Sequence, residues 1–403
     1  MSPAPRLESN YLDRALDLDS HEMVPIEFWG EIFDQDIASE ILAANMKWFT
    51  SQGDNSLSCP DLTADDSIIT PESVWSMKGP RAPGAIDFSR RLEVLDAMRV
   101  DRQLVFPTFG LFGYILLSDP GVYKKYGFDP ATIDQASVGS RMIAAHNRWA
   151  ANVTKSLNGR VRPVAIVQTD TLELMLSELD TALSNGCRAI LVPEGTPPAQ
   201  TSPGAEILDP FWARLAEANV PVTTHIGCEH AFTSSQRWSA NVPAFIPSMK
   251  SSIELPIEPR RLATMHYAVE NFLTAMILGG VFERHPTLRF GAIELTAAWV
   301  GPLGERLDEL FEKIFRTRLA NLSMKPSEYI ERNVRVTPFV YEPIDTMLDR
   351  YPYLENVLVY SSDYPHVEGG VNSKNTFNAT LERFSDRVKE KFFVTNGEWI
   401  LPE

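Results

Sequence analysis

The chain has 403 residues, of which 44% are apolar, so it can bury a core large enough for one big domain or two modest ones. Asp and Glu total 53 against 37 Lys and Arg, and the net charge of −16 argues against a nucleic-acid or anionic-membrane partner. Three scattered cysteines are too few for a disulfide framework, and no apolar leader or membrane-length apolar run is present, so we expect a soluble, cytoplasmic protein.

Short runs of β-forming residues recur along the chain, and amphipathic stretches separate most of them. The eight predicted strands are residues 14–19, 102–108, 160–167, 187–193, 220–226, 287–295, 333–340 and 356–363. The clearest predicted helices are 171–186, 211–219 and 266–285, where apolar residues recur at spacings of three and four. Eight such alternating units predict parallel pairing in a (β/α)₈ TIM barrel, which forms a single domain over residues 1–403.

Two long insertions interrupt this alternation after the first and fifth predicted strands. Residues 48–87 are rich in Pro, Ser, Gly and Asp and carry Trp75, Lys78 and Arg81. Long loops in compact domains are usually functional or disordered, so we expect this segment to be a lid or an oligomer contact. Residues 228–260 follow the carboxyl end of the fifth predicted strand, which is the end at which a barrel carries its active site. We therefore expect this segment to cover the active site.

The predicted strands end in polar residues, which is where a barrel carries its active site. Side chains alternate along a strand, so Asp19 and His21 of the first strand point the same way. One histidine or carboxylate at a strand end is more often a helix cap than a ligand, but the recurrence at several strands favours a metal site. The polar residues at or just after the strand ends are Asp19, His21, Glu22, Glu194, His225, Glu294, Asp363 and His366.

These motifs resemble the amidohydrolase-related (amidohydrolase 2) family of TIM-barrel, metal-dependent hydrolases and decarboxylases. The resemblance runs from about residue 15 to Asn396 and rests on DLDSHEMVP, TTHIG, GGVFERHPTLRFGAIELTAAWVGPLGERLDEL and YSSDYPHVEG. It implies that Asp19, His21, His225 and Asp363 are metal ligands. Two positions depart from the family pattern: Asp19 replaces the first histidine of a His-x-His element, and Glu294 replaces a histidine on the sixth strand.

The candidate ligands outnumber the needs of one ion, which leaves two mechanisms open. With one metal, such as zinc, a metal-activated water attacks a small carboxylated or carbonyl-containing substrate, or the metal assists decarboxylation. Asp363 or Glu294 is then the base, His366 donates to the leaving group or binds a substrate carboxylate, and Arg or Lys of the first insertion closes over the anion. Four more residues are candidates either for additional metal ligands or for groups that contact the ligands without touching the metal: Glu22, Glu194, His266 and His366.

The alternative is a dinuclear non-haem iron or iron–manganese oxygenase, in which Glu294 joins the ligands of two ions. The acid-x-His start with a strand-six Glu resembles the 2-aminoisobutyrate hydroxylase type of this superfamily. A third reading, a barrel that has lost catalysis and serves as a partner subunit, is disfavoured because the ligand set is retained.

The apolar walls of the substrate pocket are expected from aromatic residues near the strand ends. The candidates are Phe106, Phe109, Tyr364 and Trp75. The first insertion also makes a homo-oligomer, or a hetero-oligomer with a related subunit, the expected assembly.

Overall fold

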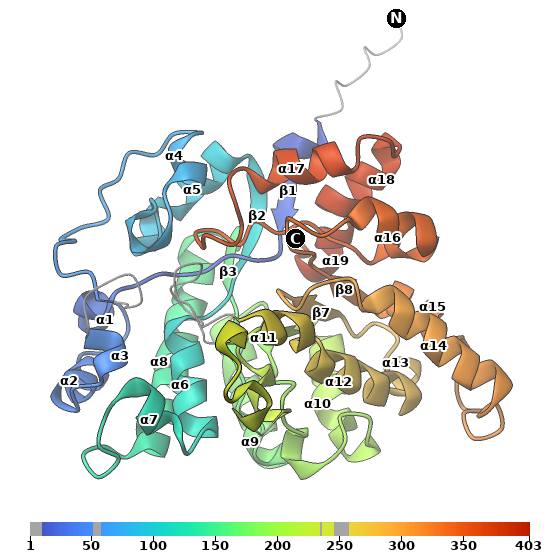
Figure 1. The fold of residues 1–403 in the computed structure, drawn as a ribbon, viewed down its shortest axis with the longest axis horizontal. Helices are drawn as coiled ribbons and strands as arrows, with labels where there is room; N and C mark the ends of the chain where they lie inside the picture. Colours follow the sequence, from blue (N-terminus) through green and yellow to red (C-terminus); the bar gives the residue numbers. More distant parts are fainter. Residues whose placement is uncertain (1–9, 51–57, 234–235, 246–257) are drawn as a thin grey trace, which may run out of the picture.

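The computed structural model describes residues 10–50, 58–233, 236–245 and 258–403, and short parallel strands run through them (Figure 1). The strands are β1 (Ala15–Asp17), β2 (Val100–Val105), β3 (Val161–Pro163), β4 (Ala165–Ile166), β5 (Ile190–Leu191), β6 (Val222–His225), β7 (Phe290–Ile293) and β8 (Val334–Val336). β1, β2 and β3 form one sheet in that order, and β4 to β8 form a second. Within each sheet, consecutive strands pair in parallel, as strands alternating with helices predict.

The two sheets meet within the predicted strand 160–167. Val164 separates β3 from β4, and its N–H donates to Val105 of β2 at 2.9 Å, whereas the next residue, Ala165, donates to Ala189 at 3.1 Å. The chain therefore switches its bonding partner from one sheet to the other across a single residue. One predicted strand thus supplies two short ones, which keeps the ring continuous at this point.

The ring closes through residues 357–364, which lie within and just after the last predicted strand. Leu358 bridges Val336 of β8, and the Val359 N–H donates to the Val336 carbonyl at 3.1 Å. On its other side, the Tyr360 carbonyl accepts from Leu18 at 3.2 Å. The prediction of a regular strand over 356–363 is therefore corrected to an extended segment with single bridges. The architecture is a TIM barrel.

Helices surround these strands, and their caps follow the sequence. In α9 (Leu172–Asn185), the Thr171 side chain accepts from the Leu174 N–H, and Gly186 ends the helix with φ +94°. α9, α10 (Asp209–Glu217), and α12 (Tyr267–Leu278) with α13 (Val281–Arg284) confirm the three predicted helices. The remaining helices are α1 (Ile26–Ile32), α2 (Gln35–Ala43), α3 (Lys47–Thr50), α4 (Ser73–Ser76), α5 (Arg91–Met98), α6 (Phe109–Ser118), α7 (Val122–Tyr126), α8 (Gln135–Ser156), α11 (Pro259–Thr264), α14 (Val300–Lys313), α15 (Pro326–Asn333), α16 (Ile344–Arg350), α17 (Ser373–Thr380), α18 (Asp386–Glu390) and α19 (Asn396–Ile400).

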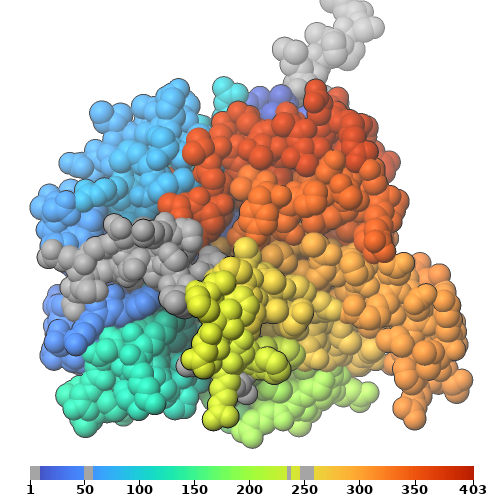
Figure 2. Space-filling model, in the orientation of Figure 1, coloured from blue at the N-terminus to red at the C-terminus, as the bar shows by residue number. Residues whose placement is uncertain are grey.

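The described parts of the insertions reach toward the strand ends. In the first insertion, the Gly79 N–H donates to the Pro365 carbonyl at 3.0 Å, which ties this segment to the loop after Asp363. In the second, Glu229 accepts from Arg261 at the start of α11, and Figure 2 shows the yellow segment that contains α11 near the centre of one face. Residues 51–57, 234–235 and 246–257 lie outside the described residues, so the lid and covering roles stay predictions.

None of the helices in the described ranges combines the length and the apolar character that crossing a bilayer requires.

Candidate metal centre

The backbone at the end of the first strand interlocks with the end of the last extended segment. Asp19 and His21 follow β1, and both are buried. The His21 N–H donates to the Tyr364 carbonyl at 2.7 Å, and the Asp363 N–H donates to the Asp19 carbonyl at 2.9 Å. These two bonds place the side chains of Asp19, His21 and Asp363 at one rim of the barrel.

His225 and Glu294 arrive at the same rim from neighbouring strands. His225 is the last residue of β6, and its Nδ1 lies 2.9 Å from the Ile226 carbonyl. A carbonyl can only accept, so Nδ1 carries the proton and the Nε2 lone pair is available to a ligand. Glu294 follows β7 with φ +54°, a left-handed conformation that is costly for a non-glycine residue, and its N–H donates to Thr337 Oγ1 at 2.9 Å. The Phe106 ring stacks on His225 at 4.2 Å and restrains its orientation.

The side-chain atoms of these residues converge closely. His21 Nε2 lies 3.4 Å from Asp19 Oδ1, 3.4 Å from Asp363 Oδ1 and 3.7 Å from Glu294 Oε2. His225 Nε2 lies 3.2 Å from Glu294 Oε2 and 3.5 Å from Asp19 Oδ1. Imidazole and carboxylate ligand atoms at these separations surround a space suited to a divalent cation.

Two overlapping groups of candidate ligands share this space. One contains Asp19, His21, His225 and Glu294, and the other contains His21, Glu294, Asp363 and His366, with the ligand atoms of each group within 4.8 Å of one another. His366 joins the second group through its Nδ1, which is 3.0 Å from Asp363 Oδ1, and its ring stacks on that of His21. The sequence predicted His366 either as an additional metal ligand or as a residue that contacts the ligands. The structure places its ring nitrogen among the candidate ligand atoms.

The electrostatics of the cluster fit a cation. Asp19 Oδ1, His225 Nε2, Glu294 Oε2 and both Asp363 carboxylate oxygens are buried with no hydrogen-bond partner among the described residues. Burial, and then the neighbouring Asp363 carboxylate, raise the pKa of Glu294 to about 8. Burial also opposes ionisation of Asp363, but His366 and His21 outweigh it and hold its pKa below the usual range. A divalent cation compensates buried carboxylates of this kind directly.

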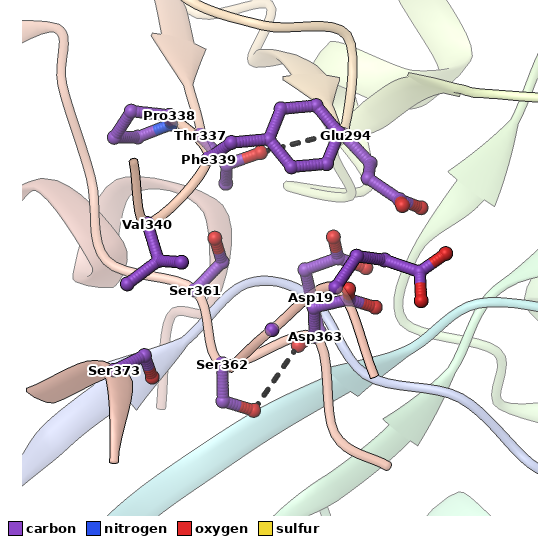
Figure 3. Close-up of a pocket in the computed structure, with 12 residues that line it drawn as sticks. Asp19, Glu294, Thr337, Pro338, Phe339, Val340, Ser361, Ser362, Asp363 and Ser373 are labelled. Atoms are coloured by element: carbon purple, nitrogen blue, oxygen red, sulfur yellow. Dashed lines mark hydrogen bonds between the residues drawn. The ribbon is translucent and has the colours of Figure 1, made fainter. Parts of the chain in front are cut away.

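A small cavity lies beside the cluster, and its volume of about 10 Å³ is room for a single water (Figure 3). Its lining includes Thr337 and three serines that the sequence reasoning did not single out. Thr337 was detectable in principle, because it lies at the end of the predicted strand 333–340. The lining residues are Asp19, Glu294, Thr337, Pro338, Phe339, Val340, Ser361, Ser362, Asp363, Glu368, Gly369 and Ser373.

The aromatic residues predicted to wall a substrate pocket are all buried, and none of them lines this cavity. Phe106 stacks on His225, and Phe109 packs against Phe33 with ring centroids 4.1 Å apart. The Tyr364 hydroxyl donates to the Pro83 carbonyl, and Trp75 lies within α4. Their role as pocket walls stays a prediction.

Three other candidates occupy distinct surroundings. Glu22 Oε1 accepts from the N–H groups of Thr108 and Phe109 at 2.8 and 2.7 Å, so it caps the start of α6. Glu194 is buried, and neither of its carboxylate oxygens has a hydrogen-bond partner in the described part of the chain. Burial and the nearby Glu229 raise its pKa well above the usual value. His266 precedes α12 and lies 3.7 Å from Glu270.

A parallel barrel with imidazoles and carboxylates gathered at the carboxyl ends of its strands defines the class of metal-dependent TIM-barrel enzymes. The family model described as Amidohydrolase (Amidohydro_2) matches residues 123–402. The chain therefore belongs to the amidohydrolase family and is an enzyme, a hydrolase or a carboxy-lyase.

Solved structures share the fold at low sequence identity. An amidohydrolase from Mycobacterium avium subsp. paratuberculosis K-10 is 22% identical, with a TM-score of 0.64 over 96% of this chain and 99% of that one. The 5-carboxyvanillate decarboxylase from Sphingomonas paucimobilis is 15% identical, with a TM-score of 0.55 over 96% and 98%. A 5-carboxyvanillate decarboxylase from Novosphingobium aromaticivorans with bound manganese is 15% identical, with a TM-score of 0.55 over 97% and 98%. No curated protein matches the chain.

Proposed function

We propose that the chain is a metal-dependent hydrolase or carboxy-lyase whose small substrate carries a carboxylate or a carbonyl group. The observation that carries the proposal is the buried convergence of Asp19, His21, His225, Glu294 and Asp363 on one space at the strand ends. The fold relatives that act on carboxylated aromatic compounds, among them the 5-carboxyvanillate decarboxylases, support a carboxylated substrate.

Asp19, His21, His225 and Asp363, with Glu294, are the residues that would hold the metal. A divalent metal bound there supplies Lewis acidity, which polarises a substrate carbonyl and acidifies water. The protein fixes the ligands in advance, because the Ile226 carbonyl sets the His225 tautomer and Thr337 holds the backbone of Glu294.

Protons are handled by the carboxylates and by His366. A carboxylate oxygen of Asp363 or Glu294 accepts the proton from the attacking water. His366 Nδ1, 3.0 Å from Asp363 Oδ1, is placed to exchange a proton with that carboxylate and to donate it to the leaving group. With a pKa raised by burial to about 8, Glu294 can hold a proton near neutral pH until a cation binds.

Lys78 is the residue of the first insertion best placed to bind a substrate anion. It is partly buried, which lowers its pKa, and the nearby Asp363 and Glu368 carboxylates act in the opposite direction. Arg81, by contrast, is exposed and pairs with Asp61 at 2.6 Å. Lys78 therefore supports a substrate that carries a carboxylate.

A dinuclear oxygenase is the second candidate function, and the two ligand groups favour it specifically. His21 and Glu294 belong to both groups, so the six side chains can be divided between two neighbouring ions. Three carboxylates and three imidazoles form a set that suits iron or manganese. Glu294 would then be the additional ligand that joins the ions.

Metal analysis combined with turnover assays separates the two candidates. The protein is purified without added metal, its metals are quantified, and chelated samples are reloaded with zinc, manganese or iron. Carboxylated and carbonyl-containing aromatic substrates are then tested with and without oxygen. One metal per chain and oxygen-independent turnover support the hydrolase or carboxy-lyase. Two iron, or iron plus manganese, ions with dioxygen consumption support the oxygenase. A chain that binds no metal, and whose activity survives His225→Ala, contradicts both.

Assembly and compartment belong to the same proposal. We place the enzyme in the cytoplasm because its three cysteines, Cys59, Cys187 and Cys228, are free thiols. We expect a homo-oligomer or a hetero-oligomer with a related subunit, and light scattering after size exclusion measures which of these forms.

A further inference from the structure

The segment that closes the barrel carries one more residue than the first strand segment opposite it. The Leu18 N–H donates to the Tyr360 carbonyl, and the His21 N–H donates to the Tyr364 carbonyl. Between these two bonds the first segment advances by three residues, from 18 to 21, and the closing segment by four, from 360 to 364. An extra residue of this kind is a β-bulge, which interrupts the regular ladder and redirects a side chain. Asp363 lies within this bulge.

Asp363 occupies the bulge in a strained conformation. Its φ of +52° is left-handed, and a non-glycine residue keeps such a conformation only where the surrounding structure holds it. One backbone bond, from the Asp363 N–H to the Asp19 carbonyl at 2.9 Å, holds the residue itself. The residues on either side of it, Ser362 and Tyr364, need anchors as well if the strained turn is to persist.

The Asp17 carboxylate anchors both of these flanking residues. Asp17 ends β1 and is fully buried. Its Oδ1 accepts from the Ser362 N–H at 2.7 Å, and its Oδ2 accepts from the Ser362 hydroxyl at 2.6 Å. The hydroxyl oxygen accepts in turn from the Tyr364 N–H at 3.1 Å. One carboxylate thus fixes the residue before Asp363 directly and the residue after it through a single hydroxyl.

The same network reaches the backbone of Asp19 and the neighbouring strand β2. Asp17 Oδ1 also accepts from the Asp19 N–H at 3.3 Å, and the Ser362 hydroxyl lies 3.4 Å from the Asp19 carbonyl oxygen (Figure 3). Gln103, which is fully buried opposite Asp17 in the parallel register, donates from Nε2 to Asp17 Oδ2 at 2.7 Å. Both oxygens of Asp17 are therefore occupied by donors, and among the described residues neither group of candidate ligands includes Asp17.

We propose that Asp17 is a positioning residue of the candidate metal centre, which holds Asp363 and Asp19 in place without touching the metal. The inference rests on the proposed metal-dependent function and adds to it a residue that acts through the ligands. Hydrogen bonds to an ionised carboxylate are stronger than those between neutral groups, so this buried network can offset the strain at Asp363. Without it, the bulge would relax and the Asp363 carboxylate would turn away from the other ligand atoms.

Metal affinity of the full-length protein, stripped of metal and titrated with zinc or manganese against a chelating dye, tests the proposal. Asp17→Ala removes all four contacts and should weaken binding at least about tenfold, as the loss of a group that orients metal ligands does. Asp17→Asn should recover most of the affinity, because its Oδ1 can still accept from Ser362 and Asp19. Gln103 can turn its amide toward the new NH₂ group, since its Oε1 has no partner in the described part of the chain. Equal losses in the two variants would assign the effect to charge and overturn the proposal.

Ser362→Ala keeps the test decisive if Asp17→Ala does not fold. It removes the hydroxyl that links Asp17 to the Tyr364 N–H and leaves the Ser362 N–H in place. The affinity should fall by about fivefold, which corresponds to the loss of one neutral hydrogen bond. An unchanged affinity in Ser362→Ala contradicts the proposed role of the network.

Asn333→Ala is the matched control for the loss of a buried polar side chain. Asn333 is fully buried at the start of β8, and its Nδ2 donates to the carbonyls of Pro286 and Leu288 at 3.0 and 2.8 Å. Because Thr337 and the metal centre lie beyond the other end of β8, this variant should lose stability but keep the affinity of the wild type. A loss of affinity equal to that of Asp17→Ala would make the effect one of general stability and overturn the proposal.

Amide hydrogen exchange of the metal-free protein separates failure of this inference from failure of the proposed function. Asp17→Ala and Ser362→Ala should speed exchange in peptides that cover residues 360–366, and Asn333→Ala should not. If the wild type binds neither zinc nor manganese, the metal-dependent function fails, but faster exchange in these peptides still supports the positioning of Asp363. Unchanged exchange there overturns the positioning role whether or not the protein binds metal.

Discussion

Glu294 Oε2 lies 3.2 Å from His225 Nε2 and 3.7 Å from His21 Nε2, so one carboxylate oxygen faces imidazoles delivered by two different strand ends. The family resemblance predicts a histidine at the position where the chain carries Glu294. Its placement makes it the residue through which the number of bound metals can be tested.

Glu294→Gln should weaken metal binding at least about tenfold, because the loss of a direct ligand charge should cost no less than the loss of an outer-shell partner. Metal content after dialysis, measured by elemental analysis, reports the effect. If the site holds two ions, the content should fall by one equivalent or more per chain, and turnover should fall with it.

The matched control is Glu305→Gln, an exposed carboxylate that accepts from the Tyr351 hydroxyl at 2.9 Å. It should leave metal content unchanged. Full metal occupancy in Glu294→Gln would remove Glu294 from the ligand set and leave it as the base alone.

Glu22→Gln separates a cap from a ligand. Because the Glu22 carboxylate accepts from the first N–H groups of α6, removing its charge should lower the free energy of unfolding by about 1 kcal/mol. Metal content should stay the same. Chemical denaturation together with metal analysis measures both quantities, and exposed Glu217→Gln serves as the reference. Loss of metal without loss of stability would show that Glu22 is a ligand.

Gly369→Ala should disturb the loop that carries Asp363. A Cβ at Gly369 would lie 2.2 Å from the Ser362 carbonyl oxygen and 3.1 Å from the Asp363 Cβ, and a backbone oxygen cannot move aside cheaply. We expect a loss of about 1–3 kcal/mol in stability and weaker metal binding. At Gly121 the nearest atom is a side-chain oxygen of Asp119 at 3.3 Å, so Gly121→Ala is the control. Equal effects of the two substitutions would contradict the tight approach at Gly369.

His146 should make stability depend on pH. Its Nε2 donates to the Val164 carbonyl at 2.8 Å, and burial lowers its pKa from 6.5 to about 4. The unfolded chain therefore binds a proton between these pH values when the folded chain does not, so stability falls as the pH drops from 6.5 to 4. The fall should be on the order of 2 kcal/mol larger in the wild type than in His146→Gln, by denaturant titration at each pH. Parallel stability curves would show that His146 does not titrate differently on folding.

Much of the fold followed from local patterns. Seven of the eight predicted strands overlap a strand of the structure, because runs such as residues 102–108 and 220–226 combine β-branched residues with buried surroundings on both faces. The segment 356–363 was harder, since its hydrogen bonds alternate between two neighbours. Bonds of this kind depend on where Val336 and Leu18 lie in space, which no local pattern encodes.

The candidate site was predictable to the extent that strand ends meet at one rim. Asp19, His21, His225, Glu294 and Asp363 could be grouped for that reason alone. The surroundings of Glu22 could not be predicted, because they depend on the start of α6, an element distant in sequence.

The closure of the ring through residues 357–364 bears on how the enzyme is made. The edge formed by Leu18 gains its neighbour only when Tyr360 has left the ribosome, so the segments made earlier stay open on one side until residues 357–364 emerge. The same late segment brings Asp363. Closure of the ring and assembly of the candidate metal site thus become one event, and a chain released before Tyr360 would lack both.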